Sequence, residues 1–144
     1  SQGTYDHAIV QFEQTLARAP DHVVALNGLG LAYAGQGDYD KALESLRHGL
    51  DIDANNASLH ADIALVLAQL GLAEEAFEHF QTAIALNPND ADTHNNLAIM
   101  LAKRGEHGDA ERHFRRALEL NPSHESAQLN LKLCLMAQDS TQTF

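Results

Sequence analysis

The 144-residue sequence has one cysteine, few basic residues and no long hydrophobic run. The single cysteine, Cys134, excludes an internal disulfide and a cysteine-based zinc cluster, and it is compatible with a reducing compartment such as the cytoplasm. Nine lysines and arginines face twenty acidic residues, a formal net charge of −11. This balance argues against a general nucleic-acid binder, because neutralising phosphates requires clustered positive charge. The longest apolar run, residues 63–68, is far shorter than the ~18 residues of a membrane span, so we expect no signal peptide and no membrane insertion.

The spacings typical of catalytic and metal sites are also missing. Nine histidines are present, but no two lie four residues apart on one predicted helix, and there is no H-E-x-x-H arrangement. Neither a G-x-S-x-G nucleophile turn nor a phosphate loop occurs. We therefore predict a non-enzymatic protein without metal or cofactor. His60 and His94 are interpreted as half-buried packing residues, and Cys134, between two leucines, as a buried apolar residue.

What the sequence does contain is a repeat of 34 residues. Four positions recur in this register: glycine at 3, 37, 71 and 105, alanine at 8, 42, 76 and 110, a large apolar residue at 12, 46, 80 and 114, and a turn position at 20, 54, 88 and 122. Each period predicts two helices joined by a short glycine-bearing turn, which is typical of a helical hairpin. The predicted hairpins are 23–35 with 38–52, 57–69 with 72–86, and 91–103 with 106–120. A lone second helix at 4–18 precedes them, and a last first helix at 125–137 follows.

The pattern of residue types within each period resembles the repeat of the tetratricopeptide repeat family. Leu26-x-x-Leu29-Gly30-x-x-Tyr33 is similar to the family's first-helix pattern, and an alanine followed four residues later by Leu46, Phe80 or Phe114 is similar to its second-helix pattern. The resemblance covers about residues 2–137 and implies an all-α, right-handed α-solenoid of antiparallel helical hairpins with a C-terminal capping helix. Two departures occur: His60 and His94 replace the aromatic residue of the first helix, and Lys132 replaces the small residue of the last one.

From this register we expect one array over residues 1–137. It contains a half repeat at 2–22 with the second helix only, full repeats at 23–56, 57–90 and 91–124, and a capping helix at 125–137. Residues 138–144 have no periodicity and are expected to form a flexible tail.

In this family the first helices of the hairpins line a concave groove that holds peptides, and the resemblance implies the same here. Equivalent first-helix positions give an apolar floor with amide and acidic edges, and Lys103 as the basic candidate. Amides can pair with a peptide backbone, and an apolar floor can hold its side chains. An alternative is that the floor positions only complete packing between adjacent helices. The predicted groove residues are Asn27, Leu31, Asp62, Leu65, Asn95, Asn96, Ile99, Lys103, Asn130 and Leu133.

A terminal-carboxylate clamp, as in some family members, is not expected, because leucine or isoleucine occupies the position at which the clamp places asparagine. We predict a scaffold that binds a peptide or a helix of a partner protein. One alternative is self-association through an uncapped N-terminal edge, where Ile9, Phe12 and Leu16 would face water. The same edge would arise if the chain were an excised piece of a longer array. A further alternative is the substrate-recruiting region of a larger enzyme such as a glycosyltransferase, since the groove is rich in asparagine.

A basic cluster on the helix at 106–120 is interpreted as a solvated face, in which Arg115 pairs with Glu119 four residues later. An acidic partner contact is the alternative interpretation. The cluster comprises Arg112, Arg115 and Arg116.

Overall fold

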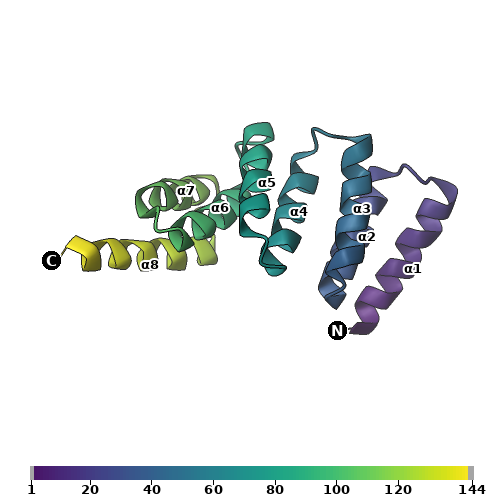
Figure 1. Ribbon diagram of the computed structural model, residues 1–144, viewed down its shortest axis with the longest axis horizontal. Coiled ribbons are helices and arrows are strands. Elements are labelled where there is room, and N and C mark those ends of the chain that lie inside the picture. The colour runs from purple at the N-terminus through teal and green to yellow at the C-terminus, as the bar shows by residue number, and fades with distance from the viewer. Residues whose placement is uncertain (1, 143–144) are drawn as a thin grey trace. The chain divides into compact units, whose positions relative to one another are not determined.

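The computed structural model describes residues 2–142, whose regular structure consists of eight α-helices without a strand (Figure 1). The all-α fold class is thereby confirmed. Every predicted helix is present with ends that differ by at most two residues, except the last, which was predicted to end at residue 137 and continues to Gln142. Residues 138–142 are therefore helical, and residues 143–144 of the expected tail lie outside the described part of the chain. The helices are α1 (Gln2–Arg18), α2 (Val23–Gln36), α3 (Tyr39–Ile52), α4 (Ala57–Gln69), α5 (Ala73–Leu86), α6 (Ala91–Lys103), α7 (His107–Leu120) and α8 (Glu125–Gln142).

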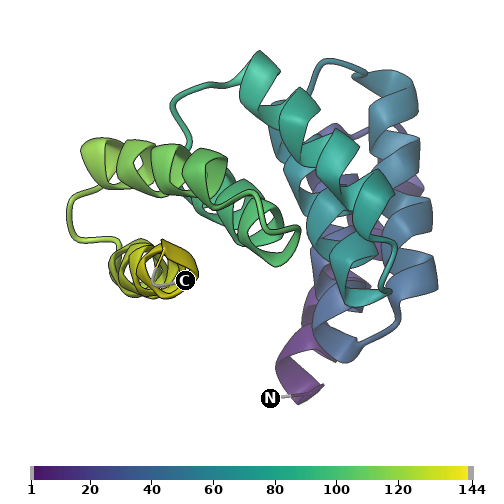
Figure 2. The ribbon, with the colours of Figure 1, turned by 60° about the vertical axis from the view of Figure 1, so that its left-hand side comes forward.

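The chain divides into two compact units, Ser1–His79 and Phe80–Phe144, with the boundary inside α5. In the first unit α2 packs against α1 and α3, and α3 packs against α4 (Figure 1). In the second unit α6 and α7 form one hairpin, and α8 packs against both of these helices (Figure 2). The prediction that all repeats form a single array stays a prediction.

The hairpin turns are set by glycines in the left-handed region of backbone space. Gly37, Gly71 and Gly105 have φ angles of 82°, 78° and 81°. A residue with a side chain is strained in this conformation, so glycine is the usual residue that ends a helix there. The glycine register recognised in the sequence therefore marks the place where each hairpin reverses direction.

The first helix of each hairpin begins at a side-chain cap that also follows the 34-residue period. The side chains of His22, Asn56, Asp90 and His124 accept hydrogen bonds from backbone N–H groups at distances of 3.1–3.3 Å. Such a bond satisfies one of the N–H groups that a helix start leaves unpaired. Two of the nine histidines thus act as helix caps, a role that the sequence analysis did not assign.

Small residues facing large ones build the core, as the repeat pattern predicted. In the first unit Gly30 of α2 lies directly against the fully buried Leu46 of α3. Close helix approach of this kind gives the dense packing of protein interiors. The second unit repeats the arrangement with Ala98, Ala110, Phe114 and Ala117 buried.

The N-terminal helix does not present the apolar edge that the sequence predicted. Ile9 is only 9% exposed and packs with Leu29 and Ala32 of α2, and Phe12 and Leu16 are partly buried against the same cluster. The prediction that these three side chains face water is therefore wrong. The physical reason is that the apolar face of α1 packs against α2, which removes these side chains from water.

No helix within residues 2–142 is both long and apolar enough to cross a membrane.

Candidate peptide-binding surfaces

The apolar floor positions are accessible in the structure. Leu31, Leu65 and Leu133 are 45%, 40% and 54% exposed, although they lie on first helices whose neighbouring residues are buried. Ile99 at the equivalent position of α6 is partly buried. Packing within each unit therefore leaves aliphatic surface at the same repeat position in α2, α4 and α8, where a partner could cover it.

In the first unit a hollow of ≈ 380 Å³ lies beside Leu31. Asn27 and Gly28 form part of its wall, and the Phe12 ring, which lies directly over Gly28, closes one side. The side-chain oxygen of Asn27 is buried and has no hydrogen-bond partner among residues 2–142. Two predicted groove residues, Asn27 and Leu31, thus lie together at an apolar hollow with an unsatisfied amide oxygen.

In the second unit four predicted groove residues lie around one hollow of ≈ 290 Å³: Ile99, Lys103, Asn130 and Leu133. The hollow is open between α6 and α8, and its lining is otherwise mainly apolar. Lys103 is exposed and makes no ion pair with any described residue. The arrangement can hold an apolar side chain and offer a positive charge to a neighbouring carboxylate.

Cys134 also lines this hollow but is not a reactive group. Its sulfur lies 3.4 Å from the backbone oxygen of His107, to which the thiol donates a hydrogen bond. Burial, reinforced by the negative charge of Glu111, raises the pKa of the Cys134 thiol. Because the thiolate is the nucleophilic form, the raised pKa lowers its reactivity.

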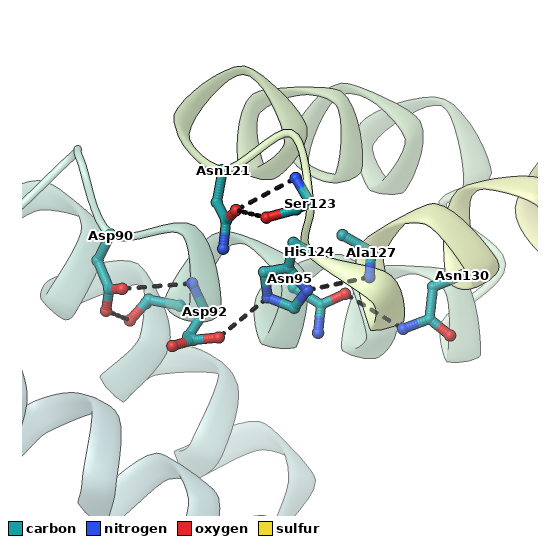
Figure 3. Close-up of polar contacts among 9 residues, drawn as sticks. Asp90, Asp92, Asn95, Asn121, Ser123, His124, Ala127 and Asn130 are labelled. Atoms are coloured by element: carbon teal, nitrogen blue, oxygen red, sulfur yellow. Dashed lines mark hydrogen bonds and ion pairs between the residues drawn. The ribbon is translucent and has the colours of Figure 1, made fainter.

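The asparagines of the predicted groove have different environments (Figure 3). Asn95 is only 5% exposed, and its Oδ1 accepts a hydrogen bond of 3.1 Å from Nδ2 of Asn130. The expectation that Asn95 offers its amide to a ligand is therefore wrong, because this oxygen joins α6 to α8. Asn96, Asn130 and Asp62 are partly buried and keep some accessible surface.

Four histidines form two contacts that the sequence analysis did not foresee. Nδ1 of His60 lies 2.9 Å from Nδ1 of His79, and Nδ1 of His94 lies 2.9 Å from Nδ1 of His113. The ring centroids are 5.1 Å apart in both pairs. His60 and His94 are 34 residues apart, as are His79 and His113, but this spacing does not show that the rings of a pair touch. No group of three or more side chains able to hold a metal ion occurs within the described residues.

The basic cluster on α7 is engaged in local ion pairs. Arg115 pairs with Glu111 at 2.7 Å, so the predicted pair with Glu119 is wrong. Glu119 instead pairs with Arg116 at 2.9 Å. The third arginine, Arg112, pairs with Asp109. These pairs agree with the interpretation of a solvated face and leave the contact to an acidic partner a prediction.

The face of α8 that is turned away from Ile99 is more apolar than the polar outer face typical of a capping helix. A hollow of ≈ 410 Å³ is lined by Leu118 of α7 and by Leu131, Lys132, Leu135 and Met136 of α8. Met136 is among the most exposed large apolar side chains. This side of the last helix therefore keeps accessible apolar surface.

Comparison with known families agrees with this architecture. Two sequence models described as tetratricopeptide repeat match residues 1–66 and 53–123, so together they cover most of the chain. The chain belongs to the tetratricopeptide repeat family. No curated protein matches it by sequence.

Solved structures of tetratricopeptide repeat proteins share the fold. The MamA protein is 26% identical with a TM-score of 0.80, over 95% of this chain and 75% of MamA. The first repeat domain of Spaghetti (RPAP3), bound to the HSP90 peptide SRMEEVD, is 25% identical with a TM-score of 0.77, over 81% of this chain and 93% of that one. YrrB, described as having an unusual peptide-binding site, is 23% identical with a TM-score of 0.74, over 95% and 71%. At this identity YrrB supports the fold alone.

Proposed function

We propose that this protein is a non-catalytic scaffold that binds a peptide segment or a helix of a partner protein on the first helices of its hairpins. The observation that carries the proposal is the set of exposed leucines at one repeat position, Leu31, Leu65 and Leu133. The family relationship adds support, since the similar Spaghetti domain binds an HSP90 peptide. Exposed apolar surface beside a hollow is a common mark of a site where a partner binds.

The hollow of the second unit defines the chemistry that we propose for its ligand. Ile99 and Leu133 supply an apolar floor, and the exposed Lys103, which has no ion-pair partner within residues 2–142, supplies a positive charge beside it. A segment that fits this site carries an aliphatic or aromatic side chain next to an acidic residue. Asn130 keeps one hydrogen-bonding group for the peptide backbone, because only its Nδ2 is directed to Asn95.

The test is peptide selection from a library of random dodecapeptides, followed by fluorescence anisotropy with the selected peptides. Substituting Ile99 and Leu133 by serine should lower the affinity by at least about tenfold, because each side chain loses apolar contact with the ligand. The matched control substitutes Ile52 and Leu86 by serine, two aliphatic residues at the ends of α3 and α5 that are 41% and 39% exposed. Equal affinity of the two double variants would refute binding at this hollow, and circular dichroism would verify that both remain helical.

Self-association is a second candidate, and the apolar hollow on the outer face of α8 favours it. A second copy would cover Leu131, Leu135 and Met136. Light scattering should then show a dimer or larger species whose mass falls to that of a monomer on Met136→Asp. A wild-type monomer at high concentration would remove this candidate. It replaces the predicted N-terminal edge, whose apolar residues are packed against α2.

A further inference from the structure

The two histidine pairs have an unambiguous pattern of donors and acceptors. Nε2 of His60 lies 3.1 Å from the backbone oxygen of Ala54, and Nε2 of His94 lies 2.9 Å from the backbone oxygen of Pro88. A carbonyl oxygen can only accept, so each of these Nε2 atoms carries the hydrogen. In a neutral ring the other nitrogen, Nδ1, is then an acceptor.

The partner ring must therefore donate. Nδ1 of His79 is 2.9 Å from Nδ1 of His60, and Nδ1 of His113 is 2.9 Å from Nδ1 of His94. His79 and His113 consequently carry their hydrogen on Nδ1, the opposite tautomer to His60 and His94. Each neutral pair thus forms a chain of two hydrogen bonds. Nδ1 of the second-helix histidine donates to Nδ1 of the first-helix histidine, and Nε2 of that ring donates to a backbone carbonyl before the first helix.

From this geometry we propose that each pair is an acid-labile clasp, which fastens the first helix of a hairpin to the second at neutral pH and opens when both rings carry a proton. The first clasp joins α4 to α5, and the second joins α6 to α7. The hairpin of α2 and α3 has no clasp, because the equivalent positions hold Leu26 and Ser45. Two of the three full repeats are thus acid-sensitive and one is not.

Protonation acts in two steps. One added proton, on Nε2 of the second-helix ring, keeps the bond between the rings but places a charge on a half-buried group. A second proton occupies the one ring nitrogen of the pair that is then still unprotonated, the Nδ1 atom of the first-helix ring. Two N–H groups then face each other, and the bond is lost.

The surroundings of the clasps favour the neutral state. Burial, the partner ring of His60 and the positive charge of Arg47 on α3 lower the pKa of His79, against the opposing effect of Glu75 and Glu78 on α5. Burial, the ring of His94 and the positive charge of Arg112 likewise lower the pKa of His113, against the opposing effect of Asp109. The largest effect on both pKa values is the loss of water around the ring.

The sign of the resulting pH dependence follows from linkage. With a folded pKa below the unfolded value of 6.5, the unfolded chain binds more protons than the folded chain in mild acid. The stabilising contribution is complete above the unfolded pKa and is lost as the pH falls through the folded pKa. Losing one hydrogen bond of ordinary strength lowers the folding equilibrium constant by about 2- to 10-fold for each clasp.

The direct test is the tautomer of each ring, read from long-range ¹H–¹⁵N correlation spectra at pH 7.5. We expect His79 and His113 to carry the hydrogen on Nδ1, and His60 and His94 to carry it on Nε2. Observation of the Nε2–H tautomer in all four rings would overturn the proposal. This readout is independent of stability and does not require a variant.

The second test measures urea unfolding at pH 7.5 and 5.5. The double variant His79→Asn, His113→Asn keeps a hydrogen-bond donor at the position of each Nδ1 atom, because the amide nitrogen of asparagine takes its place. It removes the titratable ring at both positions. We expect this double variant to lose most of the acid-induced drop in the folding equilibrium constant. His7→Asn, a change at an exposed histidine of α1, should retain the full drop. An equal drop in the wild type and the double variant would refute the clasps.

Discussion

The contact between Gly30 and Leu46 allows a quantitative test of how tightly the hairpin is packed. A Cβ atom added at Gly30 would lie 2.6 Å from Cγ and 2.8 Å from Cδ2 of Leu46, and 3.1 Å from the backbone oxygen of Ala42. Leu46 is fully buried and the carbonyl belongs to the helix backbone, so neither can move aside easily. Overpacking of this kind costs about 1–3 kcal/mol.

The substitution Gly30→Ala also has a favourable term. Alanine in a helix interior is more stable than glycine by roughly 0.5–1 kcal/mol. Subtracting this gain from the overpacking cost gives a net destabilisation within about 0–2.5 kcal/mol, with an expected value of about 1 kcal/mol. At about 3–4 °C per kcal/mol for a chain of this size, the melting temperature should fall by several degrees.

Gly108→Ala in α7 is the matched control, because nothing lies within 4 Å of an added Cβ at that position. It keeps the favourable helix term without the clash, so its stability should equal or exceed that of the wild type by up to about 1 kcal/mol. Urea unfolding followed by circular dichroism gives both values. The reasoning is refuted if Gly30→Ala is as stable as Gly108→Ala.

A double variant separates the clash from any other effect of Gly30→Ala. Leu46→Ala alone should cost about 2–5 kcal/mol, because it removes a buried side chain and leaves a cavity. In that background the added methyl group of Gly30→Ala has space, so it should stabilise. A coupling free energy near zero between the two substitutions would contradict direct contact.

Two further substitution and labelling experiments test the caps and the cysteine. Asn56→Ala should destabilise the protein by about 1 kcal/mol, because the Asn56 side chain caps α4 by accepting a hydrogen bond of 3.1 Å from the N–H of Leu59. The control is Asn55→Ala at the exposed neighbouring residue, which should leave the free energy of unfolding in urea almost unchanged. Cys134 should react slowly with iodoacetamide in the folded protein and quickly in urea, because burial raises its pKa and restricts access; equal rates under the two conditions would contradict its buried placement.

The sequence predicted the helices well because the repeat supplies several signals for each of them. The glycines at 37, 71 and 105 mark the turns, and the spacing of small and large apolar residues marks the buried faces. These signals are local, so they survive without knowledge of how distant segments meet. The last helix was predicted five residues too short, since residues 138–142 have no apolar period and continue the helix of α8 by backbone hydrogen bonding.

The candidate site was less predictable because repeat position does not determine what a side chain touches. Asn95 and Asn130 were both expected to face a ligand, yet the two amides bond to each other and bury Asn95. Arg115 forms its ion pair with Glu111 and not with Glu119, although both carboxylates lie four residues away on the same helix. Such choices depend on rotamers and on neighbouring groups, here Gln138 of α8, which also donates to Glu111.

The sequence by itself determined the repeat, the hairpins and the family, because all of these follow from periodic residue types along the chain. Only the tertiary structure decided which periodic residues meet. It packed Ile9 against α2, left Leu31, Leu65 and Leu133 exposed, and brought His60 to His79 and His94 to His113. The physical reason is that a helix period fixes the direction of a side chain, whereas the rotation and separation of two packed helices fix its partner.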